Sequence, residues 1–312
     1  MPASAWIALL AGMNLLWAGS YVVVKVGLDS LDPLALVFWR FLLAIAILGA
    51  IVAVRRVRFA PSRVDALRIL TAGLFLGFSN WLWVSGINLS NASDASLLYV
   101  FEPIWGIFLA SVLLRERLLA TTVAGLVLVL TGLAALSNFD LAAFGFNGGG
   151  VGAGNLLVIL GLACEGFFSI TLKPLARRVP ATVTTLAVLV VALAVISVPI
   201  LLRGALPAPA GAGGIAAIAY LSVICTVVGY TLWVEVMKHV PVGVMLFTVF
   251  VQPVVGPFIA AAALGEPIDG RILTGGAFLI GGMLVSVVGH LRAAKKLANA
   301  ASDPAVEMAG TV

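Results

Sequence analysis

Three ionisable residues stand inside long apolar stretches of this sequence, where a charge is costly. Arg40 lies in PLALVFWRFLLAIAIL, Glu102 in YVFEPIWGIFLASVLL and Glu165 in LLVILGLACEGFFSI. A charged residue at the centre of a bilayer costs roughly 2.5–3.5 kcal/mol on insertion scales. Each of these residues is therefore expected to face a wet cavity, to carry a proton or to meet a polar partner.

Arg40 and Glu102 are predicted to lie at a similar depth. Each is about the eighth residue of its apolar run from the same side, which is roughly 10–13 Å at 1.5 Å per residue. We expect each to be the other's partner, and two roles remain open. The pair is either a salt bridge between two helices, or a binding pair in which Arg40 receives a carboxylate and Glu102 an amine or a coupling proton. Pro103 interrupts the backbone beside Glu102, which membrane helices tolerate where they line a cavity.

Glu165 lies about thirteen residues into its own apolar run. It is expected either to line the cavity and carry a proton, or to be a neutral, hydrogen-bonded packing residue.

The composition places these residues in a membrane protein. The chain has 312 residues, of which 62% are hydrophobic and 10% charged, with a mean hydropathy of +1.18. Soluble domains carry about 25% charged residues. We predict an all-α integral membrane protein with ten transmembrane helices of about 20 residues, at 5–26, 33–54, 67–88, 94–114, 119–137, 152–174, 182–203, 214–236, 241–263 and 271–291.

The net charge of +5 predicts a topology rather than a nucleic-acid partner. Most basic residues fall in short segments that alternate spans bring to one side: 55–68, 115–117, 173–178, 238 and 292–296. By the positive-inside rule this side is the cytoplasm. We expect a multi-pass protein of the cell membrane, most simply a bacterial inner membrane, with both termini cytoplasmic and a disordered tail at 292–312.

The sequence repeats itself at an offset of 150 residues. YVFEPIWGIFLASVLLRE at 99–116 is matched by VFVQPVVGPFIAAAALGE at 249–266, with Gln252 in place of Glu102. Leu-Trp-Val also recurs, at 82–84 and 232–234. We predict two five-helix repeats, 5–137 and 152–291, joined by a Gly-rich linker at 138–151. Because five spans is an odd number, the second repeat enters the membrane inverted, as in many secondary transporters whose substrate site lies between the repeats.

Both halves contain a Pro-x-x-Gly helix that ends in Glu and is followed by a Gly-rich helix. In this respect the chain resembles the EamA branch of the drug/metabolite transporter superfamily. The matching residues are Pro103, Gly106, Glu116, Gly125 and Gly132, and then Pro253, Gly256, Glu266, Gly275 and Gly282. The resemblance implies a ten-helix exporter or exchanger of small metabolites, often amino acids, that works without ATP hydrolysis. We expect alternating access coupled to a proton or another ion, and no cofactor.

Polar and aromatic residues within the spans are the candidates for a substrate cavity: Trp17, Tyr21, Arg40, Asn80, Trp83, Tyr99, Glu102, Glu165, Tyr230 and Gln252. The prolines and glycines named above are expected to break helices or to let them approach closely. The spaced glycines Gly125, Gly132, Gly275 and Gly282 fit packing within the chain or, alternatively, the contact of a homodimer.

Two other classes of function remain open. One is a broad drug-efflux transporter. The other is an intramembrane enzyme that acts on lipid-linked substrates, which would need a nucleophile or a metal set. His239 and His290 are the only histidines and are far apart in the sequence, so we expect no metal site and no enzymatic activity.

Overall fold

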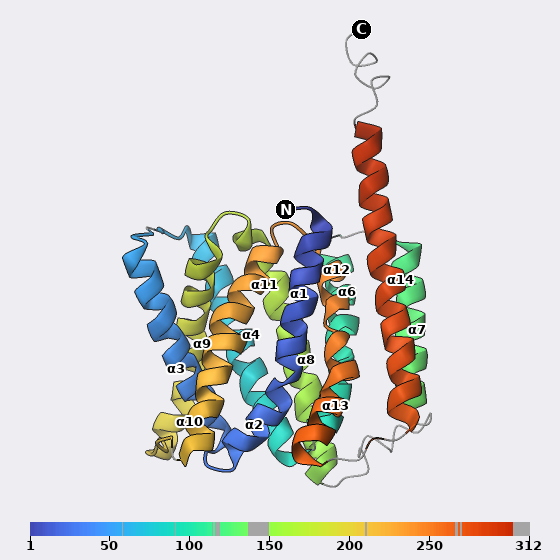
Figure 1. The fold of residues 1–312 in the computed structure, drawn as a ribbon. Coiled ribbons are helices and arrows are strands. Elements are labelled where there is room, and N and C mark those ends of the chain that lie inside the picture. Colours follow the sequence, from blue (N-terminus) through green and yellow to red (C-terminus); the bar gives the residue numbers. More distant parts are fainter. Residues whose placement is uncertain are drawn as a thin grey trace.

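The computed structural model describes residues 1–57, 59–90, 92–113, 115, 119–136, 150–209, 211–265, 268 and 270–301. In this part of the chain every regular element is a helix, and the helices run side by side in one bundle with both termini at the same end (Figure 1). Nine helical segments are long and apolar enough to cross a membrane, and a tenth, shorter apolar helix completes the set in the described residues. The predicted all-α class with ten crossings is confirmed.

The first repeat supplies five crossings. They are formed by α1 (Ala3–Ala18) with α2 (Ser20–Leu28), α3 (Pro33–Val54), α4 (Arg63–Leu89), α5 (Ala92–Leu98) with α6 (Phe101–Leu113), and α7 (Ala120–Leu136).

The second repeat supplies the other five crossings. They are formed by α8 (Gly150–Ala176), α9 (Ala181–Arg203), the continuous rod of α10 (Gly211–Tyr220), the π-helical segment η2 (Leu221–Tyr230) and α11 (Thr231–Val236), then α12 (Val242–Thr248) with α13 (Val251–Leu264), and α14 (Gly270–Ala301).

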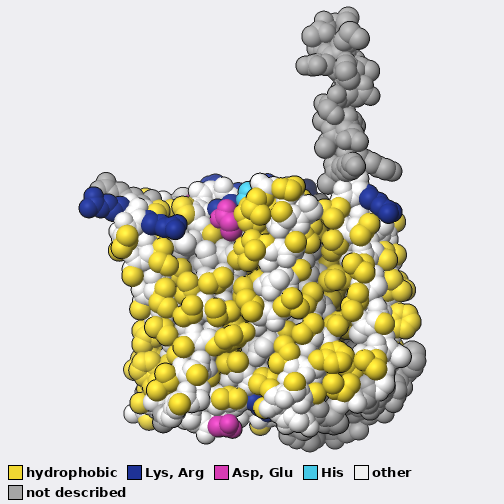
Figure 2. Space-filling view, viewed as in Figure 1, with side chains coloured by type: hydrophobic (Ala, Val, Ile, Leu, Met, Phe, Trp, Pro, Cys, Tyr) yellow, Lys and Arg dark blue, Asp and Glu magenta, His cyan; other side chains and the backbone are white. Residues whose placement is uncertain are grey.

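The surface of the bundle matches a bilayer. Figure 2 shows hydrophobic side chains over the side of the bundle that is in view and charged side chains at its two ends. Large apolar residues such as Phe108, Leu160 and Leu284 are exposed on the helices. Because water would penalise such a surface, the described part of the chain fits a lipid environment.

The fourth crossing of each repeat is broken where the sequence predicts it. α5 ends before Tyr99 and α12 ends before Val249, each four residues before a proline. A proline ring clashes with the carbonyl four residues earlier and removes one helical bond. A tighter turn replaces that bond: the N–H of Glu102 donates to the Tyr99 carbonyl at 3.1 Å, and the N–H of Gln252 donates to the Val249 carbonyl at 2.9 Å.

Glycines let the two repeats interlock. The first helix of the second repeat, α8, packs on the third helix of the first repeat, α4. A Cβ at Gly86 would lie 2.6 Å from the Gly154 carbonyl oxygen, and a Cβ at Gly256 would lie 2.6 Å from Cβ of Ser96. A Cβ at Gly106 would overlap the Leu246 side chain. Positions 96 and 106 are the repeat equivalents of 246 and 256, so the same contact occurs twice.

The spaced glycines join α7 to α14. A Cβ at Gly125 would lie 2.6 Å from the Gly282 carbonyl oxygen, and one at Gly132 would lie 2.9 Å from the Gly275 carbonyl oxygen. This surface is therefore covered within one chain. These contacts fit the packing role of the glycines within the chain, and the homodimer stays a prediction.

Two lysines cap equivalent helices. Lys25 Nζ donates to the Ser90 carbonyl at the end of α4, and Lys173 Nζ donates to the Val240 carbonyl at 2.8 Å. Ser90 and Val240 are separated by the repeat offset of 150 residues. Each lysine satisfies a carbonyl that a helix end leaves without an internal partner.

The last helix extends further than the sequence predicted. The segment 292–312 was expected to be disordered from its start, but α14 continues to Ala301. Its residues AAKKLANAA are good helix formers, and the membrane helix extends through them. The remainder of the tail, positions 138–149 of the linker, Glu116 and Glu266 lie outside the described residues.

Candidate functional site

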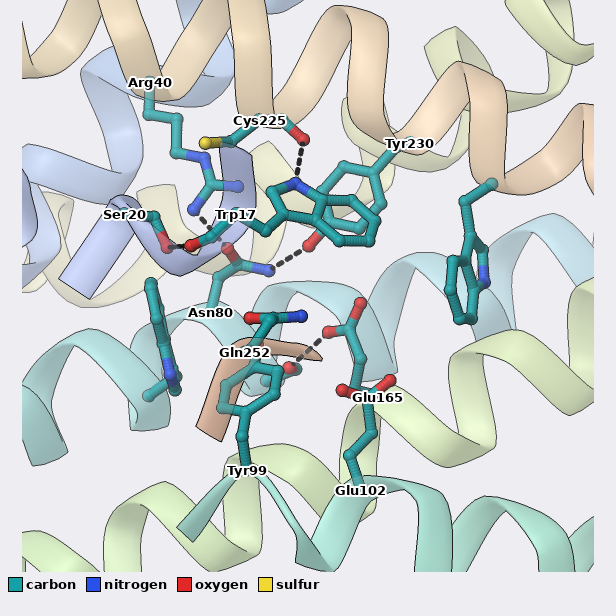
Figure 3. A pocket seen from close by; sticks show the side chains of 13 residues that line it. Trp17, Ser20, Arg40, Asn80, Tyr99, Glu102, Glu165, Cys225, Tyr230 and Gln252 are labelled. Carbon is teal, nitrogen blue, oxygen red and sulfur yellow. Dashed lines mark hydrogen bonds between the residues drawn. The ribbon is translucent and has the colours of Figure 1, made fainter. Parts of the chain in front are cut away.

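A polar cavity lies between the two repeats, and we call it the central cavity (Figure 3). Nine of the ten predicted site residues line it, together with four that the sequence did not single out. The lining residues are Trp17, Ser20, Arg40, Ser79, Asn80, Trp83, Tyr99, Glu102, Glu165, Cys225, Tyr230, Trp233 and Gln252.

Arg40 is held by two neutral acceptors. Its Nε donates to Thr226 Oγ1 and its Nη1 to Asn80 Oδ1, both at 2.8 Å. Asn80 Nδ2 in turn donates to the Tyr230 hydroxyl at 3.1 Å, and the guanidinium carbon lies 6.0 Å from the Tyr230 ring centroid. Asn80 and Tyr230 are repeat equivalents, so Arg40 is anchored where the two halves meet.

The prediction that Arg40 pairs directly with Glu102 is wrong. Within the described residues no ion pair joins them, since the guanidinium is turned toward Thr226 and Asn80. A guanidinium has five N–H donors, and two of them are used. The other three have no hydrogen-bond acceptor among the described residues, although the side chain is only 4% exposed.

Glu102 and Glu165 reach the central cavity from α6 and α8. Figure 3 shows both carboxyl groups pointing into it. Glu165 Oε2 accepts a hydrogen bond of 2.6 Å from the Ser79 hydroxyl. Glu102 is 4% exposed. Neither carboxylate forms an ion pair with a described residue, so both remain able to take a cationic group or a proton.

Gln252, the counterpart of Glu102 in the second repeat, is held in place by hydrogen bonds from both ends of its side-chain amide. Its Nε2 donates to Asn14 Oδ1 at 2.7 Å, and its Oε1 accepts from the Tyr21 hydroxyl at 2.9 Å. Tyr21 is the one predicted site residue outside the lining. It lies behind the wall, edge-on to Tyr99 at 5.5 Å and to Trp83 at 5.7 Å between ring centroids, and it positions Gln252.

Aromatic rings form much of the remaining wall. The ring centroids of Trp17 and Trp233 are 5.8 Å apart, and those of Trp17 and Tyr230 are 6.1 Å apart. The indole N–H of Trp17 donates to the Cys225 carbonyl at 3.1 Å, and that of Trp233 donates to Ser169 Oγ at 3.0 Å. These bonds fix the two indole rings in the wall of the cavity.

Four lining residues and two supporting residues escaped the sequence analysis. Trp233 is the repeat equivalent of Trp83 and could have been found from the offset of 150. Ser79 precedes Asn80, and Cys225 is a small uncharged residue that nothing in its sequence neighbourhood singles out. Thr226 and Asn14 support the site from positions 186 and 238 residues away from their partners, and no sequence signal reveals such contacts.

The central cavity is narrow in this conformation. Its free volume is about 40 Å³, which holds a few water molecules and no metabolite. A solute can therefore enter only if the helices around the cavity move.

A polar cavity between two membrane repeats is the arrangement in which many transporters hold their substrate. A model of the EamA-like transporter family matches residues 4–138 and 152–288. The chain belongs to this family, as the resemblance predicted.

Known proteins similar to this chain include other transporters. An uncharacterized transporter of Archaeoglobus fulgidus is 26% identical over 89% of this chain and 96% of its own length. A protein of Salmonella typhimurium described as a "probable amino-acid metabolite efflux pump" is 26% identical over 88% of this chain and 91% of its own. A solved crystal structure superposes with a TM-score of 0.72 over 92% of this chain and 98% of its own, at 20% identity, and this likeness concerns the fold.

Proposed function

We propose that this transporter exports small zwitterionic metabolites of the amino-acid type by alternating access, with a proton as the coupling ion. The proposal rests chiefly on one observation. A buried arginine with unused N–H donors and two carboxylates share one narrow cavity between the repeats.

Each charged group of the central cavity has a proposed role. Arg40 receives the substrate carboxylate, because a guanidinium matches a carboxylate with parallel N–H donors. Glu102 receives the substrate amine. Glu165, which faces Glu102, Arg40 and Tyr230 in the same cavity, carries the coupling proton.

The aromatic wall and the relatives support the same class of substrate. An ammonium group is attracted to the faces of tryptophan and tyrosine rings, which surround the cavity. The Salmonella typhimurium relative is described as an amino-acid metabolite efflux pump. The basic segments at the end that carries both termini support a cytoplasmic location of that end. Export therefore moves the substrate from that end to the opposite end.

Reconstitution into liposomes tests this function. The purified protein is expected to exchange labelled zwitterionic amino acids across the bilayer, with flux above protein-free liposomes and sensitive to a pH gradient. A broad drug-efflux transporter would instead move lipophilic cations and leave amino acids behind. Chemical turnover of a lipid-linked substrate without flux would contradict transport altogether.

A further inference from the structure

A second hollow lies at the end of the bundle that carries both termini, and it is separate from the central cavity. It has a free volume of about 740 Å³ and opens between α3 of the first repeat and α9, η2 and α11 of the second. We call it the basic groove. Its rim contains Arg55, Arg177, Arg178 and Lys238, and its apolar wall includes Ile51 and Val228.

The charge balance of the basic groove is positive. Arg178 is paired with Asp65, and Lys238 Nζ lies 2.6 Å from Glu235 Oε2. Arg55 and Arg177 have no ion-pair partner among the described residues, and both are exposed. Two basic side chains therefore remain uncompensated at the mouth of the groove. In Figure 2 basic side chains gather along this end of the bundle, with the hydrophobic belt directly below.

Two further groups in the basic groove are ready to bind an anionic, oxygen-rich ligand. α9 begins in the groove at Ala181 and has no side-chain cap, so the unpaired N–H groups of its first turn favour negative charge. Thr231 also lines the groove, and its buried hydroxyl has no hydrogen-bond partner in the described part of the chain.

We propose that the basic groove binds an anionic phospholipid, with its phosphate at Arg55 and Arg177 and an acyl chain along Ile51 and Val228. A soluble anion would use the basic rim but gain nothing from the apolar wall, of which Val228 is 46% exposed. Basic pockets between membrane helices are suited to anionic headgroups. Because the two repeats form opposite walls, the bound lipid bridges the parts that must move during transport.

Native mass spectrometry of the full chain in detergent tests this site. Titration with long-chain phosphatidylglycerol is expected to show one tight site, and phosphatidylcholine, which has no net charge, is expected to bind at least tenfold more weakly. Each basic residue near a lipid surface is worth roughly fivefold in affinity. The double variant Arg55→Gln/Arg177→Gln should therefore lose about 25-fold in affinity for phosphatidylglycerol.

Matched variants distinguish this site from a general surface charge. Arg63→Gln removes an exposed charge at the same end but outside the groove, and should leave the affinity within about twofold. The double variant Arg55→Lys/Arg177→Lys keeps both charges and should retain most of the lipid binding. It therefore tests the charge requirement independently of whether the glutamine variant folds.

Three results would overturn the proposal. They are equal binding of phosphatidylcholine and phosphatidylglycerol, equal loss in the groove and control variants, or displacement of the lipid by inorganic phosphate, which would indicate a site for a soluble anion.

Discussion

Replacing Arg40 by lysine keeps the positive charge of the central cavity but removes the geometry that we assign to substrate binding. Arg40 reaches Thr226 Oγ1 and Asn80 Oδ1 with two different nitrogens, both at 2.8 Å. A lysine ammonium is a single nitrogen on a flexible chain. It cannot donate to both acceptors and still present parallel N–H groups to a carboxylate.

The magnitude follows from the bonds at stake. A hydrogen bond to a charged group contributes about 1.5–3 kcal/mol, and Arg40→Lys is expected to remove one such bond to the substrate carboxylate. Substrate affinity should fall roughly 10- to 150-fold, at about 1.4 kcal/mol for each factor of ten. Thermal unfolding should change less, because the charge remains and one of the two protein acceptors keeps its donor.

The assay compares amino-acid binding and flux in proteoliposomes for Arg40→Lys and for Arg203→Lys. Arg203 is a suitable control because its side chain is 61% exposed at the end of α9 and does not line the cavity. Wild-type kinetics in a folded Arg40→Lys protein would refute the role of the guanidinium. An equal loss in the control would show that the change is not specific to the cavity.

Three other predictions follow from the same structure. Glu165→Gln should flatten the pH dependence of transport at normal expression, because an amide cannot exchange the coupling proton, and an unchanged pH profile would leave Glu165 a packing role. Gly282→Ala should lower stability by about 1–3 kcal/mol, since its Cβ would lie 2.5 Å from a carbonyl oxygen of α7. Gly281→Ala is its control, with no atom within 4 Å, and similar melting temperatures for the two variants would contradict this packing. Reporters fused after Phe59 and Asn147 should read cytoplasmic and external, and a cytoplasmic signal at Asn147 would contradict the inverted topology.

Much of the fold could be predicted because membrane insertion and duplication both leave marks in the sequence. Apolar runs locate the crossings, and the prolines at 103 and 253 predict the breaks that the structure contains. The offset of 150 residues also relates Asn80 to Tyr230, which bond to each other. Isolated charges such as Arg40 and Glu165 indicate the cavity because lipid would exclude them.

The remaining features depend on packing that a local pattern does not encode. Arg40 was assigned the wrong partner because equal depth in the membrane does not specify which way a long side chain turns. Thr226 reaches it from η2, a π-helical segment that apolar periodicity does not distinguish from an α-helix. The extension of α14 to Ala301 was missed because polarity was taken as a sign of disorder, whereas alanine and lysine also favour helix.

Side-specific labelling of Cys225 tests most directly whether the central cavity is the transport path. Cys225 lines the cavity and is 1% exposed in this conformation. A Cys164→Ser background leaves it as the only thiol of the chain, which has two cysteines. In transport-active vesicles, we predict that an impermeant thiol reagent reaches Cys225 from either side and that a saturating amino acid substrate slows the reaction. A thiol that reacts only after denaturation, or that reacts from one side without any effect of substrate, would contradict alternating access through this cavity.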